Sequence, residues 1–82
     1  MSQEEIKEGI LNGTIPVVEG MEFEWVTALT FGDPDFVRIA ITSIDRGIIH
    51  STFWGGTEWG TIHIFKFQLK YGKIRNIKLP RA

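Results

Sequence analysis

The chain has 82 residues, of which 43% are hydrophobic, 12% aromatic and 23% charged. This composition excludes a disordered or fibrous protein and predicts a single small domain over residues 1–82. The absence of cysteine excludes disulfides, thiolate zinc sites and thiol nucleophiles. The first residues are too polar for a signal peptide, and no apolar run is long enough for a membrane span, so we expect a soluble, cytoplasmic protein.

The net charge is only −1, but the charges are unevenly distributed along the chain. Residues 1–35 contain eight acidic residues and one basic residue, whereas residues 36–82 contain eight basic and two acidic residues. From Lys66 onward every charged residue is basic. Such a division indicates either an anion-binding end or two halves that attract each other, within the fold or across a dimer.

The start of the chain predicts a short helix over about residues 3–12. Ser2 and Glu5 have the spacing of a capping box, in which each side chain accepts a hydrogen bond from the other residue's backbone N–H. Asn12-Gly13 is a typical helix end, because glycine adopts the left-handed conformation at little steric cost. So short a helix is not stable alone, and we expect it to lie against a sheet.

Three extended segments follow, over residues 14–19, 21–31 and 36–44. The first contains Pro16, which favours an edge strand or a linker. The second alternates apolar and polar residues as a half-buried strand does. A turn is predicted between the second and third, at Gly32-Asp33-Pro34-Asp35. Its two aspartates lack the further acids that a calcium-binding loop requires.

The segment from Ile48 to Phe65 reads nearly the same in both directions about Gly56-Thr57. This symmetry predicts a hairpin of strands over residues 48–54 and 59–71. Four identical pairs would lie opposite one another: Trp54 with Trp59, Thr52 with Thr61, His50 with His63 and Ile49 with Ile64. Because side chains alternate across a strand, the Trp, Thr and His pairs would share one face.

A last strand over residues 74–79 is predicted to return along residues 59–71 after a turn at Gly72. This basic C-terminal hairpin would place Ile77 against Phe67 and Leu79 against Phe65. The predicted fold is therefore α+β, with a short N-terminal helix packed on a curled antiparallel β-meander of about five strands.

The face with the Trp, Thr and His pairs is the most chemically suggestive surface of the predicted sheet. An apolar surface with a few converging polar groups is typical of a small-ligand site. We therefore expect a small non-enzymatic binding protein for an amphipathic or ring-containing ligand, held by His50, Thr52, Trp54, Trp59, Thr61 and His63.

The same side chains also have plainer interpretations. Cross-strand Trp pairs commonly serve packing alone, and the two histidines could be structural or could transfer protons. Two imidazoles without a third ligand make a poor metal site. No cofactor, no metal and no catalytic residue is predicted, and nothing in the sequence indicates a substrate.

Partners are predicted from the two remaining surfaces. The reverse face of the sheet is partly apolar and predicts a homodimer through Ile49, Phe53, Ile62 and Ile64. As an alternative, this face or the acidic first strand (Glu22, Glu24) could make the chain a protein-interaction or inhibitor module. A further alternative is single-stranded nucleic-acid binding, with Tyr71 or a Trp stacking on bases and phosphates bound by Lys66, Lys70, Arg75 and Lys78.

The order of the strands predicted within residues 36–79 resembles the C-terminal sheet of the nuclear-transport-factor-2-like cone-shaped proteins, of the SnoaL and ketosteroid-isomerase type. The matching elements are Phe65-Lys66-Phe67 and Gly72-Lys73-Ile74. That family begins with several helices and this chain with one, so the resemblance implies a reduced cone whose pocket a partner subunit closes. The family's catalytic carboxylates have no matching position here, so the resemblance implies no catalytic residue.

Overall fold

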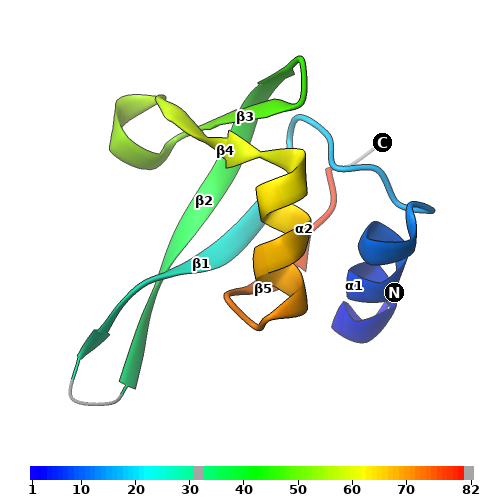
Figure 1. The fold of residues 1–82 in the computed structure, drawn as a ribbon, viewed down its shortest axis with the longest axis horizontal. Coiled ribbons are helices and arrows are strands. Elements are labelled where there is room, and N and C mark those ends of the chain that lie inside the picture. The colour runs from blue at the N-terminus through cyan, green and yellow to red at the C-terminus, as the bar shows by residue number, and fades with distance from the viewer. Residues whose placement is uncertain (31–32, 81–82) are drawn as a thin grey trace.

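The computed structural model describes residues 1–30 and 33–80, without the side chains of residues 28–30, 33–34 and 54. Two α-helices, a short 3-10 helix and five strands follow one another along the chain (Figure 1). Their bounds are α1 Gln3–Asn12, β1 Glu22–Thr30, β2 Asp33–Asp45, β3 Ile48–Ser51, η1 Phe53–Gly55, β4 Glu58–Thr61, α2 Ile62–Lys70 and β5 Ile74–Lys78. The structure confirms the predicted α+β class with an N-terminal helix and a five-stranded antiparallel sheet.

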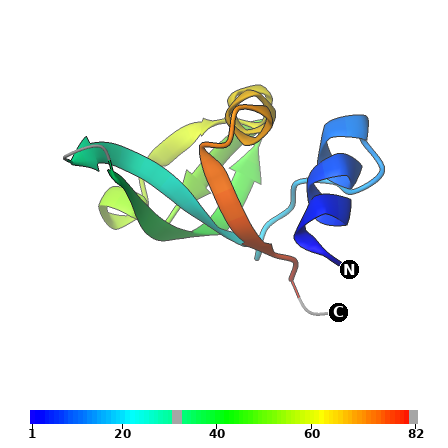
Figure 2. The same ribbon diagram turned by 90° about the horizontal axis from the view of Figure 1, so that it is seen from below.

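The strand order is β4-β3-β2-β1-β5, and every neighbouring pair is antiparallel. The predicted meander is therefore correct for the first four strands and wrong for β5. This last strand pairs with β1, with Trp25 opposite Ile74, and does not pair with β4. The chain crosses from one edge of the curled sheet to the other through α2 (Figure 2).

The predicted strand over residues 59–71 is wrong beyond Thr61, because α2 begins at Ile62. The side chain of Thr61 caps this helix, accepting a hydrogen bond from the Ile64 N–H at 3.1 Å. Two fully or nearly buried residues of α2, Phe65 and Leu69, are four positions apart, as on one helix face. The same stretch also alternates with a period of two, so both structures fit the sequence pattern locally.

Other predicted elements need smaller corrections. Residues 14–19 form no strand; instead the Ile15 N–H donates to the Gly9 carbonyl and turns the chain back over α1. The predicted strand over 48–54 ends at Ser51, after which the chain coils into η1. In the predicted turn at Gly32–Asp35, Gly32 lies outside the described residues and Asp33 already begins β2.

The mirror-image pairing of the central hairpin is wrong. β3 and β4 are indeed antiparallel neighbours, but Ile48 lies opposite Thr61, Ile49 opposite Gly60 and His50 opposite Glu58. The physical reason is that η1 and the two left-handed glycines that end it, Gly55 and Gly56, lengthen the connection. The identical residues are consequently out of register.

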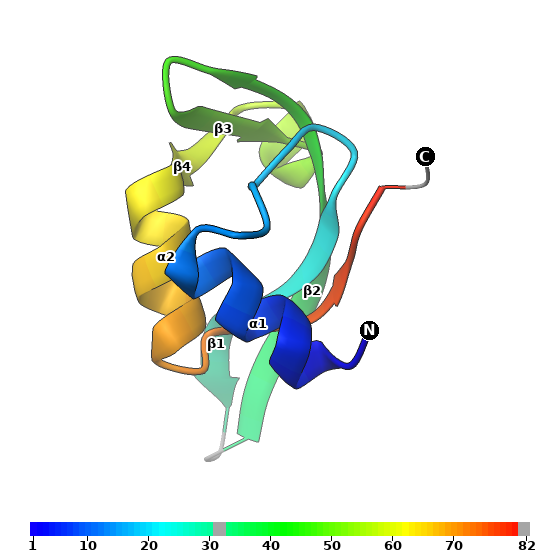
Figure 3. The same cartoon turned by 90° about the vertical axis from the view of Figure 1, so that its right-hand side faces the viewer.

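The capping box of α1 is confirmed. The Glu5 N–H donates to the Ser2 hydroxyl at 3.2 Å, and the Ser2 N–H donates to the Glu5 carboxylate at 3.3 Å. The helix ends at Gly13, whose φ of 88° is left-handed. Ile6 and Ile10 are buried. The helix lies beside α2 and β5 (Figure 3), where Ile6 and Ile10 join the hydrophobic core.

The core centres on aromatic side chains from the sheet and α2. The ring of Phe23 makes edge-to-face contacts with Phe65, at a centroid distance of 5.0 Å, and with Trp59, at 5.4 Å. Trp25 extends the cluster by packing edge-on against Trp59 at 5.5 Å and against Phe53 at 5.4 Å. The cluster joins β1, η1, β4 and α2 in one packed unit.

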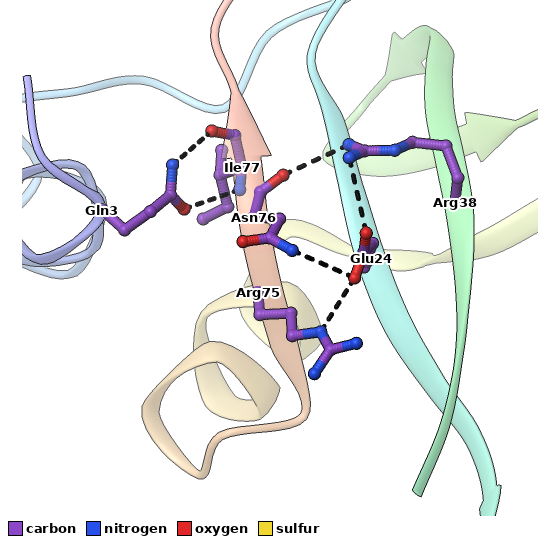
Figure 4. A network of polar contacts seen from close by, with 6 residues as sticks. All are labelled: Gln3, Glu24, Arg38, Arg75, Asn76 and Ile77. Atoms are coloured by element: carbon purple, nitrogen blue, oxygen red, sulfur yellow. Dashed lines mark hydrogen bonds and ion pairs between the residues drawn. The ribbon is translucent and has the colours of Figure 1, made fainter.

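The side-chain amide of Gln3, on α1, forms two hydrogen bonds with the backbone at the free edge of β5. The Ile77 N–H donates to Gln3 Oε1 at 2.7 Å, and Gln3 Nε2 donates to the Ile77 carbonyl at 2.8 Å (Figure 4). Gln3 thus takes the place of a neighbouring strand at this one residue. Because unpaired strand edges recruit other chains, the contact both anchors α1 and protects the edge.

The Gln3 contact generates a stability prediction. We expect Gln3→Ala to lower the free energy of unfolding by about 1–3 kcal/mol, because it leaves two part-buried backbone groups of β5 unpaired. Urea denaturation followed by circular dichroism measures the change. Glu8→Ala, at an exposed position of the same helix, is the matched control and should shift stability by less than about 0.5 kcal/mol. Equal effects of the two substitutions would contradict the role of Gln3.

Candidate functional site

The predicted Trp, Thr and His residues do not form one surface. His50 is half-buried on β3, whereas His63 is exposed in the first turn of α2. Thr52 accepts a hydrogen bond from the Ala40 N–H at 3.2 Å and so closes the end of β3 against β2. Thr61 is the N-cap of α2. Both threonines therefore have structural roles, and the histidines lie on different elements rather than opposite each other.

The two tryptophans of the predicted face also differ from expectation. Trp59 packs within the aromatic cluster, and its Nε1 is buried without a hydrogen-bond partner among the described residues. The side chain of Trp54 lies outside the described residues, and its backbone belongs to η1 rather than a strand. The plainer interpretation, packing, therefore holds for Trp59.

The structure lacks the main element on which the resemblance to the cone-shaped proteins rests, a late strand at residues 65–67. Phe65-Lys66-Phe67 is helical, so it is not a late strand of a sheet. Gly72-Lys73-Ile74 does lead into β5, but that strand returns to β1 and not to the segment before it. The expected pocket of that fold is not assembled by these residues.

A groove lies between the C-terminal half of α2 and β1. It has a volume of about 680 Å³ and is lined by Trp25, Val26, Thr27, Phe67, Gln68, Tyr71 and Lys73. The last pair between β1 and β5 is Trp25 with Ile74, so the groove lies where β5 no longer covers the edge of β1. Most of its lining is apolar or aromatic, which is the usual character of a ligand-binding surface.

Two exposed aromatic side chains form the outer wall of the groove. Phe67 is 61% exposed and Tyr71 is 60% exposed. They are four positions apart across the end of α2, and their ring centroids are 4.8 Å apart. The Lys70 ammonium lies 5.9 Å from the centre of the Tyr71 ring. Large aromatic surfaces left in water in this way favour a partner.

The inner wall is held in place by Trp25. Its ring is packed against Phe53 and Trp59, and its indole N–H donates to the side-chain carbonyl of Gln68. This hydrogen bond ties the wall formed by β1 to the wall formed by α2. The groove therefore has one aromatic wall fixed by the core and one that is solvent-exposed.

Sequence reasoning missed this site because it assigned α2 to a strand. In a strand, Phe67 and Tyr71 share a face with Phe65 and Leu69, which would bury all four. In the helix, Phe65 and Leu69 face the core while Phe67 and Tyr71 point to solvent. The signal that could have found the site is Thr61, a good N-cap residue directly before the apolar run.

The four predicted anion contacts do not form a hairpin surface. Lys66 and Lys70 belong to α2, and Arg75 and Lys78 to β5, which leads away from α2 to pair with β1. Arg75 is already engaged within the fold. Its Nε donates to Glu24 at 2.8 Å, and its guanidinium lies 3.7 Å from the centre of the Phe36 ring.

Glu24 is the centre of a polar network on the outer face of the sheet (Figure 4). Its carboxylate also accepts a hydrogen bond from Asn76 at 3.2 Å and lies 3.6 Å from the Arg38 guanidinium. The hydrogen bond from Arg75, followed by the one from Asn76, lowers the pKa of Glu24 below its ordinary value. The acidic half of the chain thus meets the basic half inside the fold.

The predicted dimer surface is not a single exposed face. Ile49 is fully buried in the core, Phe53 and Ile62 are half-buried, and Ile64 is 43% exposed. The reason is that Ile62 and Ile64 lie on a helix and the other two on a strand and a 3-10 turn. The homodimer itself stays a prediction.

Among the described residues, no group of three or more His, Cys, Asp or Glu side chains could hold a metal ion. None of the helices in residues 1–30 and 33–80 is long and apolar enough to cross a membrane. Comparison with protein families, with curated proteins and with solved structures finds no match to this chain.

The N-cap role of Thr61 predicts a loss of stability rather than of binding. We expect Thr61→Ala to lower the free energy of unfolding by about 0.5–2 kcal/mol, because the Ile64 N–H loses its acceptor. Thr61→Ser keeps the hydroxyl and should restore most of this loss. Thermal and urea denaturation of both variants measure the effect. A destabilised serine variant would show that the methyl group, and not the cap, matters.

The Glu24 network predicts a pH-dependent stability. Because folding lowers the pKa of Glu24, its stabilising contribution is fully present above the unfolded-state pKa and is lost as the pH falls through the folded-state pKa. We expect the difference in unfolding free energy between wild type and Glu24→Gln to be largest near neutral pH and to shrink below about pH 4. Denaturation at a series of pH values measures it, with Glu58→Gln on β4 as the exposed control. A difference that grows on acidification would contradict the assignment.

Proposed function

We propose that the chain is a small binding protein that holds a ring-containing, largely apolar ligand in the groove between α2 and β1. The observation that carries the proposal is the pair of exposed rings, Phe67 and Tyr71, facing a groove whose other wall is Trp25. This keeps the class of ligand expected from the sequence but moves the site from the Trp, Thr and His residues to α2.

The size of the groove supports a small molecule. Its volume of about 680 Å³ falls within the range of roughly 300–1,000 Å³ that small-ligand sites occupy. A planar ring could insert between the walls, because aromatic rings pack well both edge-on and in offset stacks. The hydrogen bond between Trp25 and Gln68 fixes the walls before binding, which reduces the ordering cost of capture.

The contribution of each wall can be tested with phenylnaphthylamine, a neutral aromatic probe whose fluorescence rises in apolar surroundings. We expect Phe67→Ala and Tyr71→Ala each to raise its dissociation constant by roughly twofold to tenfold, the effect of losing one aromatic contact. Fluorescence titration of the purified protein gives the constant.

The matched control is Leu11→Ala, which removes an apolar side chain that is 37% exposed on α1, away from the groove. This variant should bind the probe as wild type does. The proposed function is overturned if the probe does not bind at all. It is also overturned if folded Phe67→Ala and Tyr71→Ala variants bind the probe as well as wild type does.

A further inference from the structure

We infer that the ligand of the α2–β1 groove is an amphipathic anion: an aromatic ring system that carries a carboxylate or phosphate group. This inference rests on the proposed function above and adds the charge of the ligand to it. It is carried by two hydrogen-bond donors that the fold leaves available at the groove, on Gln68 and Lys73.

The first donor is the side-chain amide of Gln68. An indole N–H can only donate, so the hydrogen bond from Trp25 requires that the amide oxygen of Gln68 point toward the indole. The amide NH₂ group of Gln68 makes no hydrogen bond to the part of the chain that the structure describes. It therefore stays free to donate to a ligand in the groove.

The second donor is the ammonium group of Lys73. The backbone of this residue is anchored to both walls: its N–H donates to the Gln68 carbonyl at 2.9 Å, and its carbonyl accepts from the Val26 N–H at 3.0 Å. Its side chain is exposed, lines the groove and makes no ion pair with any side chain that the structure describes. The fold thus places an unpaired positive charge at the end of an aromatic groove.

The remaining lining residues do not supply an opposing charge. None of the described residues that line the groove is acidic. The Thr27 hydroxyl donates to the Asp35 carbonyl at 3.4 Å. Because this hydrogen bond is long and weak, the hydroxyl can reorient. A cationic ligand would meet Lys73 without a compensating acid, whereas an anion would gain an ion pair and a hydrogen bond from Gln68.

Two fluorescent probes that differ in one group test this inference. Anilinonaphthalenesulfonate is phenylnaphthylamine with an added sulfonate, so it has the same rings and a negative charge. We expect Lys73→Gln to raise the dissociation constant of the sulfonate about threefold more than that of the neutral probe, as for an exposed ion pair. Lys78→Gln, the same charge change at an exposed site on β5, should alter neither constant.

Gln68→Glu tests the second donor without removing the acceptor that Trp25 needs. This variant replaces the NH₂ group by a carboxylate oxygen. It should therefore weaken binding of the sulfonate, relative to binding of the neutral probe, by at least as much as Lys73→Gln does. Displacement of the sulfonate by naphthoate, naphthyl phosphate and naphthalenemethanol then compares three head groups on one ring system. The carboxylate or the phosphate should displace it better than the alcohol.

The outcomes separate the two proposals. The anion inference alone is overturned if neutral-probe binding depends on Phe67 and Tyr71 but neither Lys73→Gln nor Gln68→Glu weakens the sulfonate more than the neutral probe. A Lys78→Gln effect equal to that of Lys73→Gln would also overturn it, because the charge would then act at long range. If neither probe binds, the proposal that the groove is a binding site is overturned as well.

Discussion

The packing of Phe65 against Phe23 and Trp59 holds together elements that the sheet alone would leave apart. β4 and β5 lie at opposite edges of the sheet, so the chain must cross between them. It does so as α2, which buries Phe65 and Leu69 and closes the open side of the curled strands. An extended crossover would leave its backbone groups unpaired over an apolar core, whereas a helix satisfies them internally. The topology therefore depends on this segment being helical.

The candidate site follows from the same crossover. A helix that buries one face exposes another, and the exposed face of α2 carries Phe67 and Tyr71 at its C-terminal end. There β5 begins only opposite Trp25, so β1 extends past its neighbour and leaves a groove beside the helix. The candidate binding surface and the core-packing surface are thus different faces of one helix. The backbone of Lys73, bonded to both Gln68 and Val26, joins the end of the helix to the strand.

Part of the opposite charge of the two halves of the chain is paired within the fold, at Glu24. Glu24 comes from the acidic half, and Arg38, Arg75 and Asn76 approach it from strands on either side of β1. This confirms, for these residues, the interpretation that the two halves attract each other. Such exposed pairs contribute little individually, but a network that joins three strands helps to fix their register. Lys73 takes no part in this network and lines the groove instead.

The sequence by itself determined the local features: the capping box of α1, its left-handed end at Gly13, and the presence of β1 and β2. These depend on neighbouring residues and on turn chemistry. It could not decide between helix and strand for residues 62–70, because their apolar residues fit both periods. Nor could it give the register of β3 and β4, since the apparent symmetry ignored the extra length of η1. Only the tertiary structure decided these points, because burial of Phe65 and pairing of β5 with β1 are long-range contacts, and the site at Phe67, Tyr71 and Lys73 exists only once they form.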